Sequence, residues 1–162
     1  RRVFFIALRN DLANPFMEKV DMFQEAPKLD LNFNEKEITF KEVNDSNDKT
    51  KEVGAQGRKD IWYKVTQGNY FSSAHPKGHY FQDYRLRFSD TVKTLVASSG
   101  NGCWHPKYCR LLNKIELCRV GTYPQDYSFL KNKPKYLIGM SVPPVMTAQI
   151  SSRIYEQWLS KI

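Results

Sequence analysis

The sequence lacks several features that would assign it to a common class of protein. No apolar run approaches the roughly 18 residues needed to span a bilayer, so we expect no transmembrane helix and no membrane partner. It has no glycine-rich phosphate loop and no serine-triad motif, which argues against the enzyme classes that depend on them. The chain opens on Arg1, Arg2 and a strand-like run, without a methionine. We therefore expect no signal peptide and interpret the chain as a fragment or a processed product.

Cysteine and histidine are scarce, with three residues each. An odd number of cysteines without a secretory signal favours free thiols in a reducing compartment. Cys103, His105 and Cys109 lie close together, but no second pair follows at zinc-ligand spacing. We therefore predict no metal site, and a structural zinc module is the minor alternative. None of the cysteines has flanking residues typical of a nucleophile, and Cys118, beside Leu117, is expected in the core.

The chain does contain enough apolar residues for a core, and it carries an excess of positive charge. Hydrophobic residues make up 41% of its 162 residues and aromatic residues 14%, which is too apolar for a disordered tail. This length predicts one domain, or one domain with an appendage. Lysine and arginine number 25 against 17 aspartates and glutamates, a net charge of +8. Such a surplus indicates either a polyanionic partner, usually nucleic acid, or ordinary solubility charge.

Apolar patterning predicts both strands and helices. The continuous apolar run at residues 3–8 predicts a buried strand, and residues 37–43 fit a strand or a short helix. Residues 44–60 are polar and turn-rich, so we expect an exposed linker there. From Ile61 onward, aromatic residues lie among glycine, serine and histidine, which favours short strands joined by glycine turns. Residues 91–97 are expected to form a further strand.

Two helices are predicted near the C-terminus. Asn113 is a suitable N-cap with Glu116 three residues later, and that helix should end at Gly121. Residues 141–162 predict a long amphipathic helix whose opening turn contains two prolines. Its apolar face consists of Met146, Ile150, Ile154 and Trp158. This face needs a covering surface, because burying each such side chain stabilises the fold by roughly 1.5–3 kcal/mol.

Basic residues interleaved with aromatic ones form a candidate face for nucleic acid. Alternation over residues 84–88 places Arg85 and Arg87 on one face of a predicted strand. With Lys93 and Arg110 they could contact DNA phosphates or guanine edges. The alternative is that these basic residues do not bind DNA and only form a solvated strand face beside a hydrophobic one. We favour contact with DNA.

Three separated blocks together resemble the C-terminal portion of bacterial or phage-type DNA (cytosine-5)-methyltransferases. Residues 1–12 resemble the strand that follows this family's Gln-x-Arg-x-Arg motif, and residues 136–148 are similar to its closing Gly-Asn-Ser-Val-Pro motif. Residues 110–127 resemble a third motif, Arg-x-Leu-(Thr/His)-x-x-Glu-Cys-x-Arg followed by Gly-(Phe/Tyr)-Pro-x-x-Tyr. The matching positions are Arg110, Leu112, Glu116, Cys118, Arg119, Tyr123, Pro124 and Tyr127. The order and spacing of the blocks agree over nearly the whole chain.

The resemblance implies an α/β fold, namely the C-terminal part of a mixed-sheet, S-adenosylmethionine-dependent methyltransferase domain with an inserted small β-rich recognition domain. It assigns residues 1–19 to the end of the catalytic sheet, about 20–108 to the target-recognition domain, and 109–162 to closing motifs and a helix returning to the catalytic domain. The family's catalytic cysteine, in a Pro-Cys-Gln loop, its Glu-Asn-Val glutamate and its glycine-rich cofactor loop would all precede residue 1. We therefore expect this chain alone to be inactive, with double-stranded DNA and the N-terminal catalytic half as its partners.

The resemblance also implies roles at the active site. Arg2 matches the second arginine of the Gln-x-Arg-x-Arg motif and would lie near the flipped cytosine. Ser141 and Val142 match the closing motif and would edge the pocket for S-adenosylmethionine. Met140 stands where the family has asparagine, so that polar contact to the cofactor is not available from this side chain.

In the recognition domain, Thr94 and Leu95 match the family's Thr-Leu signature. The resemblance implies that Thr94 braces this domain on a DNA phosphate, and that Arg110 and Arg119 tie it to the catalytic domain. The implied function is DNA recognition and completion of the active site of an enzyme that methylates a flipped cytosine. Such enzymes belong to restriction-modification, and we expect a cytoplasmic, nucleoid-associated location in a bacterial or phage-infected cell. The alternative is a stand-alone basic DNA-binding module or a degenerate methyltransferase remnant, whose salt-sensitive DNA binding would not depend on cofactor.

Overall fold

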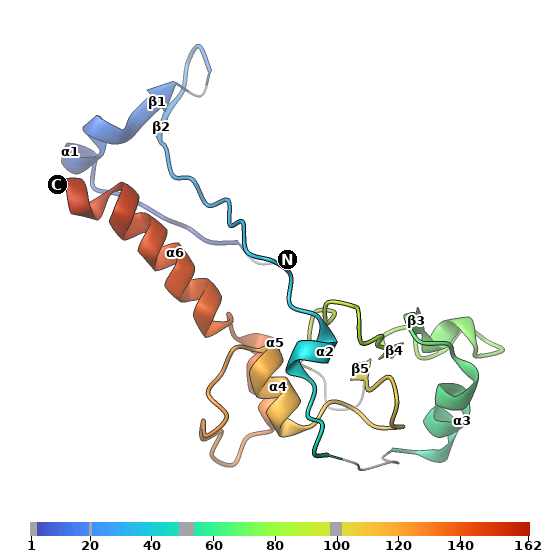
Figure 1. Cartoon of the computed structure of the whole chain (residues 1–162). Coiled ribbons are helices and arrows are strands. Elements are labelled where there is room, and N and C mark those ends of the chain that lie inside the picture. Colours follow the sequence, from blue (N-terminus) through green and yellow to red (C-terminus); the bar gives the residue numbers. More distant parts are fainter. Residues whose placement is uncertain (1–2, 20, 49–53, 98–101) are drawn as a thin grey trace. The chain divides into compact units, whose positions relative to one another are not determined.

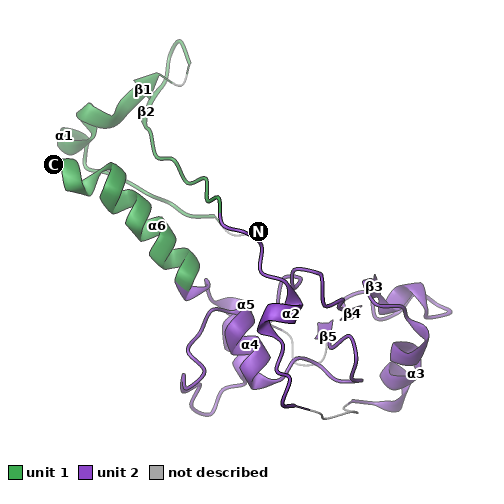
Figure 2. Cartoon of the chain, viewed as in Figure 1, with its two compact units in different colours: residues 1–34, 145–162 green, residues 35–144 purple. Residues whose placement is uncertain are grey.

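The computed structural model describes residues 3–19, 21–48, 54–97 and 102–162. The chain divides into two compact units, one of residues 1–34 and 145–162 and the other of residues 35–144 (Figure 2). Short helices and very short strands occur in both units (Figure 1), so the fold mixes α and β structure. In the described part of the chain, no helix is both long and apolar enough to cross a membrane.

The first unit contains a hairpin and the C-terminal helix. Its elements are α1 (Asn10–Ala13), the 3₁₀ helix η1 (Asn14–Phe16), β1 (Met17–Lys19), β2 (Glu25–Pro27), α6 (Pro144–Gln157) and the 3₁₀ helix η3 (Leu159–Lys161). Strands β1 and β2 pair antiparallel, with Glu18 opposite Ala26. The proline at the second position of η1 suits that position, because its fixed φ is already helical.

Helix α6 is held to the segment after the hairpin by one buried ring and several hydrogen bonds. Trp158 is 4% exposed, its Nε1 donates to the Lys28 carbonyl at 2.7 Å, and its ring centroid lies 6.3 Å from that of Phe16. Gln157 forms two 2.8 Å hydrogen bonds with the backbone of Asp30. Because Trp158 satisfies its N–H while burying its ring, it is the anchor at this end of the helix.

The predicted amphipathic closing helix is confirmed in its main part, since α6 begins at Pro144. Ile150 and Trp158 of the predicted face are buried, whereas Met146 is 41% exposed. Ser141 is not part of α6. It is the extended C-cap of a separate helix, α5 (Pro134–Met140), which the sequence pattern did not predict.

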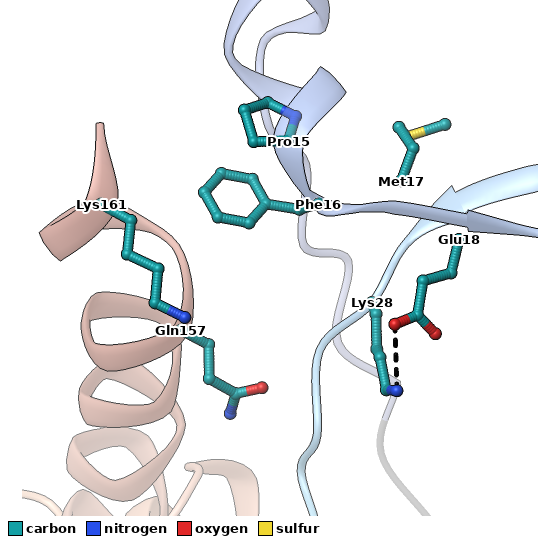
Figure 3. A pocket seen from close by; sticks show the side chains of 7 residues that line it. All are labelled: Pro15, Phe16, Met17, Glu18, Lys28, Gln157 and Lys161. Carbon is teal, nitrogen blue, oxygen red and sulfur yellow. Dashed lines mark hydrogen bonds and ion pairs between the residues drawn. The ribbon is translucent and has the colours of Figure 1, made fainter.

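A cavity of about 300 Å³ lies beside the hairpin and the end of the chain (Figure 3). Its lining residues are Pro15, Phe16, Met17, Glu18, Lys28, Gln157 and Lys161. Lys28 Nζ and Glu18 Oε1 pair there at 3.0 Å, and both side chains are more than half exposed. Water screens such a pair, so it contributes little to stability.

The buried strand predicted for residues 3–8 is wrong for this structure. The segment joins no strand of the described residues, and Val3 and Phe5 are 71% and 96% exposed. A buried strand is stabilised by neighbours on both edges and by covered faces. An apolar run alone does not supply them.

The second unit is built on a small mixed sheet. Its elements are α2 (Phe40–Val43), α3 (Gln56–Lys64), β3 (Asn69–Tyr70), the 3₁₀ helix η2 (Phe71–Ser73), β4 (Tyr84–Arg85), β5 (Cys103–Trp104), α4 (Lys114–Val120) and α5. Strand β4 is central: it pairs antiparallel with β3 and parallel with β5. Each strand has only two residues, so packed side chains hold most of this unit together.

Those side chains form two apolar cores. The first core contains Phe40, Leu86 and Cys118, each 0% exposed, and joins α2, the end of β4 and α4. The second contains Trp62 and Trp104 and joins α3 to β5. Cys118 therefore lies in the core, as predicted.

Several local predictions for this unit are wrong, and tertiary packing accounts for each. Trp62 lies on helix α3 rather than on a strand, because its ring is taken into the second core. The expected strand at residues 91–97 is reduced in the described residues to one bridge, between Thr91 and Thr39. Residues 44–60 are not simply an exposed linker, since Asp45 is buried and α3 begins within them. For residues 37–43, the short helix is the correct alternative.

The predicted helix from Asn113 to Gly121 is confirmed as α4. Asn113 Oδ1 accepts from the Glu116 backbone N–H at 2.8 Å, and Glu116 Oε2 accepts from the Asn113 N–H at 3.0 Å, a complete capping box. Gly121 is the C-cap. A Cβ at Gly121 would lie 2.6 Å from Ile138 Cγ2, so this glycine permits the close approach of α5.

Candidate nucleic-acid interface

A buried ion pair between Arg110 and Glu116 lies at the centre of the second unit. Arg110 is 2% exposed and Glu116 0%, and the guanidinium donates to both carboxylate oxygens, at 2.7 and 2.9 Å. The same carboxylate accepts from the backbone N–H groups of Asn113 and Asp45. One glutamate thus pairs with an arginine, caps α4 and fixes the start of the 45–48 turn.

Further contacts join α4 to the segment that follows α2. Arg119 Nη1 donates to the Asn44 carbonyl at 2.8 Å, and Asn113 Nδ2 donates to Asp45 at 3.0 Å and Asp48 at 2.8 Å. These bonds fix α4 against residues 43–48. The predicted role of Arg110 and Arg119 in tying two domains of an enzyme remains a prediction.

Electrostatics keep Arg110 charged in its buried position. Burial alone would lower its pKa, but the bonds to Glu116 and the negative charges of Glu116, Asp48 and Asp45 outweigh burial and raise the pKa. Arg110 Nε also lies 3.5 Å from Asp48 Oδ2. The pair is therefore a desolvated unit whose partners depend on one another.

His105 is a structural residue within the same cluster. Its Nε2 lies 2.9 Å from Asn44 Oδ1, and its Nδ1 accepts from the backbone N–H groups of Lys107 and Tyr108 at 3.0 Å. Burial, and then the charge of Arg110, lower its pKa to about 4. Both ring nitrogens are engaged, and the described residues contain no group of three possible metal ligands. The structure therefore offers no support for the zinc alternative.

The cysteines are poorly suited to nucleophilic chemistry. Cys103, Cys109 and Cys118 are all buried, and none of them forms a disulfide. Burial raises the pKa of Cys103 to about 11, and burial also raises the pKa of Cys118. A nucleophilic cysteine needs a lowered pKa and access to substrate.

Arg85, predicted to contact DNA, is largely engaged within the protein. Its guanidinium lies 3.7 Å from the centroid of the Trp62 ring and donates to the carbonyls of Trp62, Val65 and Pro106. These bonds use four of its five N–H donors. The side chain thus joins α3 to the loop after β5, and its contact with DNA stays a prediction.

Arg87 is more accessible than Arg85. Its side chain is exposed and its Nε donates to the Gln67 carbonyl at 3.0 Å. This single bond leaves the outer face of the guanidinium toward solvent. The geometry therefore favours Arg87 over Arg85 as a residue that can contact a phosphate, and this contact remains a prediction.

A hollow of about 290 Å³ opens beside β4 in the second unit. Its lining residues are Tyr70, Phe81, Gln82, Tyr84, Lys93, Thr94, Val96, Gly102 and Cys103. Thr94 of the predicted Thr-Leu signature is thus exposed at the hollow, whereas Leu95 packs against the first core. Of the two residues of this signature, one is therefore at the surface and the other packs against the core. The contact of Thr94 with phosphate remains a prediction.

The turn after α5 carries the two residues predicted to edge a cofactor pocket. Ser141 and Val142 are half-buried. The Ser141 hydroxyl donates to the Ile138 carbonyl at 2.9 Å, and its backbone N–H closes the helix on the same residue at 3.2 Å. These bonds fix the turn while the hydroxyl oxygen keeps its acceptor lone pairs.

Comparison with known families decides the assignment of the chain. The family model described as C-5 cytosine-specific DNA methylase matches residues 1–156. The chain belongs to the C-5 cytosine-specific DNA methylase family. Comparison with curated proteins and comparison with solved structures give no match. The resemblance read from the three sequence blocks is confirmed.

Members of this family methylate carbon 5 of cytosine in DNA and use S-adenosylmethionine as methyl donor. Arg2, the predicted contact to the target base, lies outside the described residues. Val142 is a half-buried apolar side chain next to the Ser141 hydroxyl, which can still accept a hydrogen bond, and the position of both residues at the edge of a cofactor pocket stays a prediction. Neither residue lines the cavities of 300 and 290 Å³, so most of a cofactor pocket would have to come from other residues.

Sequence reasoning missed two features of this methylase chain. One is Asp83, which is 0% exposed and accepts from Gly102 N–H and Trp104 Nε1 and from Arg58 Nε. The other is the hollow itself. The concentration of aromatic residues after Ile61 is a signal for it, but the pattern predicts short strands and a basic face rather than a hollow.

Proposed function

We propose that this chain recognises double-stranded DNA and completes the active site of a DNA (cytosine-5)-methyltransferase whose nucleophilic cysteine lies on an N-terminal catalytic portion. The family match over residues 1–156 carries the proposal. The three cysteines of this chain support the second part, because all are buried and burial raises the pKa of Cys103 and Cys118. None of them follows a proline, as the family's Pro-Cys-Gln loop requires.

In this proposal the residues of the chain bind and orient, while the N-terminal portion supplies the thiolate. Extruding the cytosine costs a few kcal/mol, and Arg2 contacts the extruded base. Thr94 and Arg87 contact the DNA backbone, where a net charge of +8 favours association. S-adenosylmethionine, when bound, supplies the methyl group, and Ser141 and Val142 form one edge of its pocket.

Exposed apolar residues support an N-terminal portion as partner. Val3, Phe4 and Phe5 are exposed, on a segment that we expect to belong to the catalytic sheet of the whole enzyme. Exposed apolar patches of this kind are typical of interaction surfaces. Covering them would give the segment the strand neighbours that the described residues do not provide.

The test is a methyl-transfer assay with labelled S-adenosylmethionine and duplex DNA. The N-terminal portion of a family member, this chain, and the two together are compared. We expect no transfer by this chain alone and transfer by the mixture, reduced by Arg2→Ala. Transfer by the isolated chain would place the nucleophile within it and overturn the proposal.

A degenerate, DNA-binding remnant is the second candidate, favoured by one observation. Met140, 56% exposed, replaces the asparagine of the family's closing motif, so a polar contact near the cofactor is lost. A remnant would bind duplex DNA with the same affinity in the presence and absence of S-adenosylmethionine, and this would also hold when it is mixed with the N-terminal portion. An increase in affinity with the cofactor would exclude this candidate.

A further inference from the structure

The hollow beside β4 has walls of aromatic side chains and a basic rim. Tyr84 is 7% exposed and forms a fixed wall, because its hydroxyl donates to Asp90 Oδ2 at 3.2 Å. The Tyr70 ring packs edge-on against it, with centroids 4.9 Å apart. Lys93 Nζ lies 5.3 Å from the Tyr84 ring centroid. The walls are therefore ordered before any ligand arrives.

A tight turn carries Phe81 and Gln82 to the mouth of the hollow. The Asp83 N–H donates to the Tyr80 carbonyl at 3.0 Å, and Tyr80 has a φ of 62°, an uncommon conformation for a residue other than glycine. Its ring lies 5.0 Å from the Arg58 guanidinium carbon, and Asp83 is buried and fully bonded. This anchoring leaves Phe81 68% exposed.

Size and chemistry limit what such a hollow can hold. At about 290 Å³ it lies at the lower end of the range of small-molecule sites, about 300–1,000 Å³. Aromatic walls favour a flat ring, because a planar ligand can stack on them. Lys93 at the rim favours a ligand attached to a negative backbone, as does the charge of the whole chain, +8.

We propose that this hollow receives one unstacked nucleobase of the bound DNA, with Phe81 and Tyr70 stacking on it and Lys93 contacting the adjoining phosphate. This base is distinct from the target cytosine, which enters the catalytic site. Stacking of bases on aromatic side chains is a general mode of binding unpaired nucleic acid. The inference rests on the proposed function, because it needs DNA to be bound by this chain.

The experiment compares two duplexes of the same sequence at one salt concentration, one fully paired and one with a single bulged 2-aminopurine. The full chain is titrated into each, and anisotropy and 2-aminopurine fluorescence are followed. We expect the bulged duplex to bind about tenfold more tightly, equivalent to ~1.4 kcal/mol. We also expect its fluorescence to fall, because stacking on an aromatic ring quenches it.

Two variants separate this site from other effects. Phe81→Ala changes an exposed side chain, so we expect it to fold, to bind the paired duplex as before, and to lose both the tenfold preference and the quenching. Tyr63→Ala is the matched control, since Tyr63 is 61% exposed and lies on α3, outside the hollow. It should retain both signals.

Each other outcome is decisive. Equal binding of the two duplexes, or a preference and quenching that persist in Phe81→Ala, would overturn this inference and leave the proposed DNA recognition intact. Failure to bind either duplex would overturn both.

Discussion

Glu116 offers the sharpest test of how the second unit is stabilised. Its carboxylate is 0% exposed and accepts four hydrogen bonds, two of them from Arg110. Glu116→Gln preserves size and one acceptor oxygen but removes the charge, leaving the buried guanidinium without its bidentate partner. Removing one partner of a buried pair costs about 3–5 kcal/mol.

We expect the lower end of that range, about 3 kcal/mol, because Asp48 Oδ2 lies 3.5 Å from Arg110 Nε and partly compensates its charge. Small domains are stable by only about 5–15 kcal/mol, so urea unfolding should show a clear drop in midpoint. The matched control is Glu18→Gln, which removes an exposed pair and should change stability by less than about 1 kcal/mol. Equal unfolding midpoints for the two variants would refute the reasoning.

Two further predictions concern pH and charge. The pKa of His105 is lowered to about 4 in the folded protein, below its ordinary value near 6.5, so the free energy of unfolding should fall as pH drops from about 6.5 towards 4. Urea unfolding at each pH should show a smaller fall in His105→Gln and an unchanged fall in the control, His79→Gln. Arg87→Gln should weaken duplex binding and reduce the slope of the logarithm of the binding constant against the logarithm of salt concentration by about one, with little change in stability; an unchanged slope would remove Arg87 from the interface. Arg85→Gln should instead lower the unfolding midpoint, because Arg85 donates hydrogen bonds to three backbone carbonyls.

Local signals in the sequence predicted local structure well. The cap formed by Asn113 and Glu116, and the end of α4 at Gly121, depend on residues within one helix, and the structure contains both features. Helix α6 likewise follows from a repeat every four residues and from Pro144. Such features can be predicted because the interacting groups are close in sequence.

Features that depend on distant residues were missed or predicted wrongly. Residues 3–8 have a strand-like pattern but no strand partner among the described residues. Trp62 lies on helix α3, where its ring belongs to a core built from residues far along the chain. The sequence pattern predicted Arg85 to be a surface cation. In the structure its guanidinium donates to backbone carbonyls that lie 20 or more residues away along the chain. The pairing of Arg110 with Glu116 was also not predicted, because Arg110 was assigned to a DNA-contacting face and Glu116 to the cap of α4, and nothing in the sequence joined the two roles.

Asp83 has a consequence for how binding preferences could be altered. Its carboxylate connects β5 to α3, while the two residues immediately before it, Phe81 and Gln82, project at the end of the same turn. Replacement of Phe81, which is 68% exposed, changes what the protein contacts while the hydrogen bonds of Asp83 stay in place. Under the proposed function, a new preference for DNA can therefore arise by exchanging one exposed side chain on an unchanged framework.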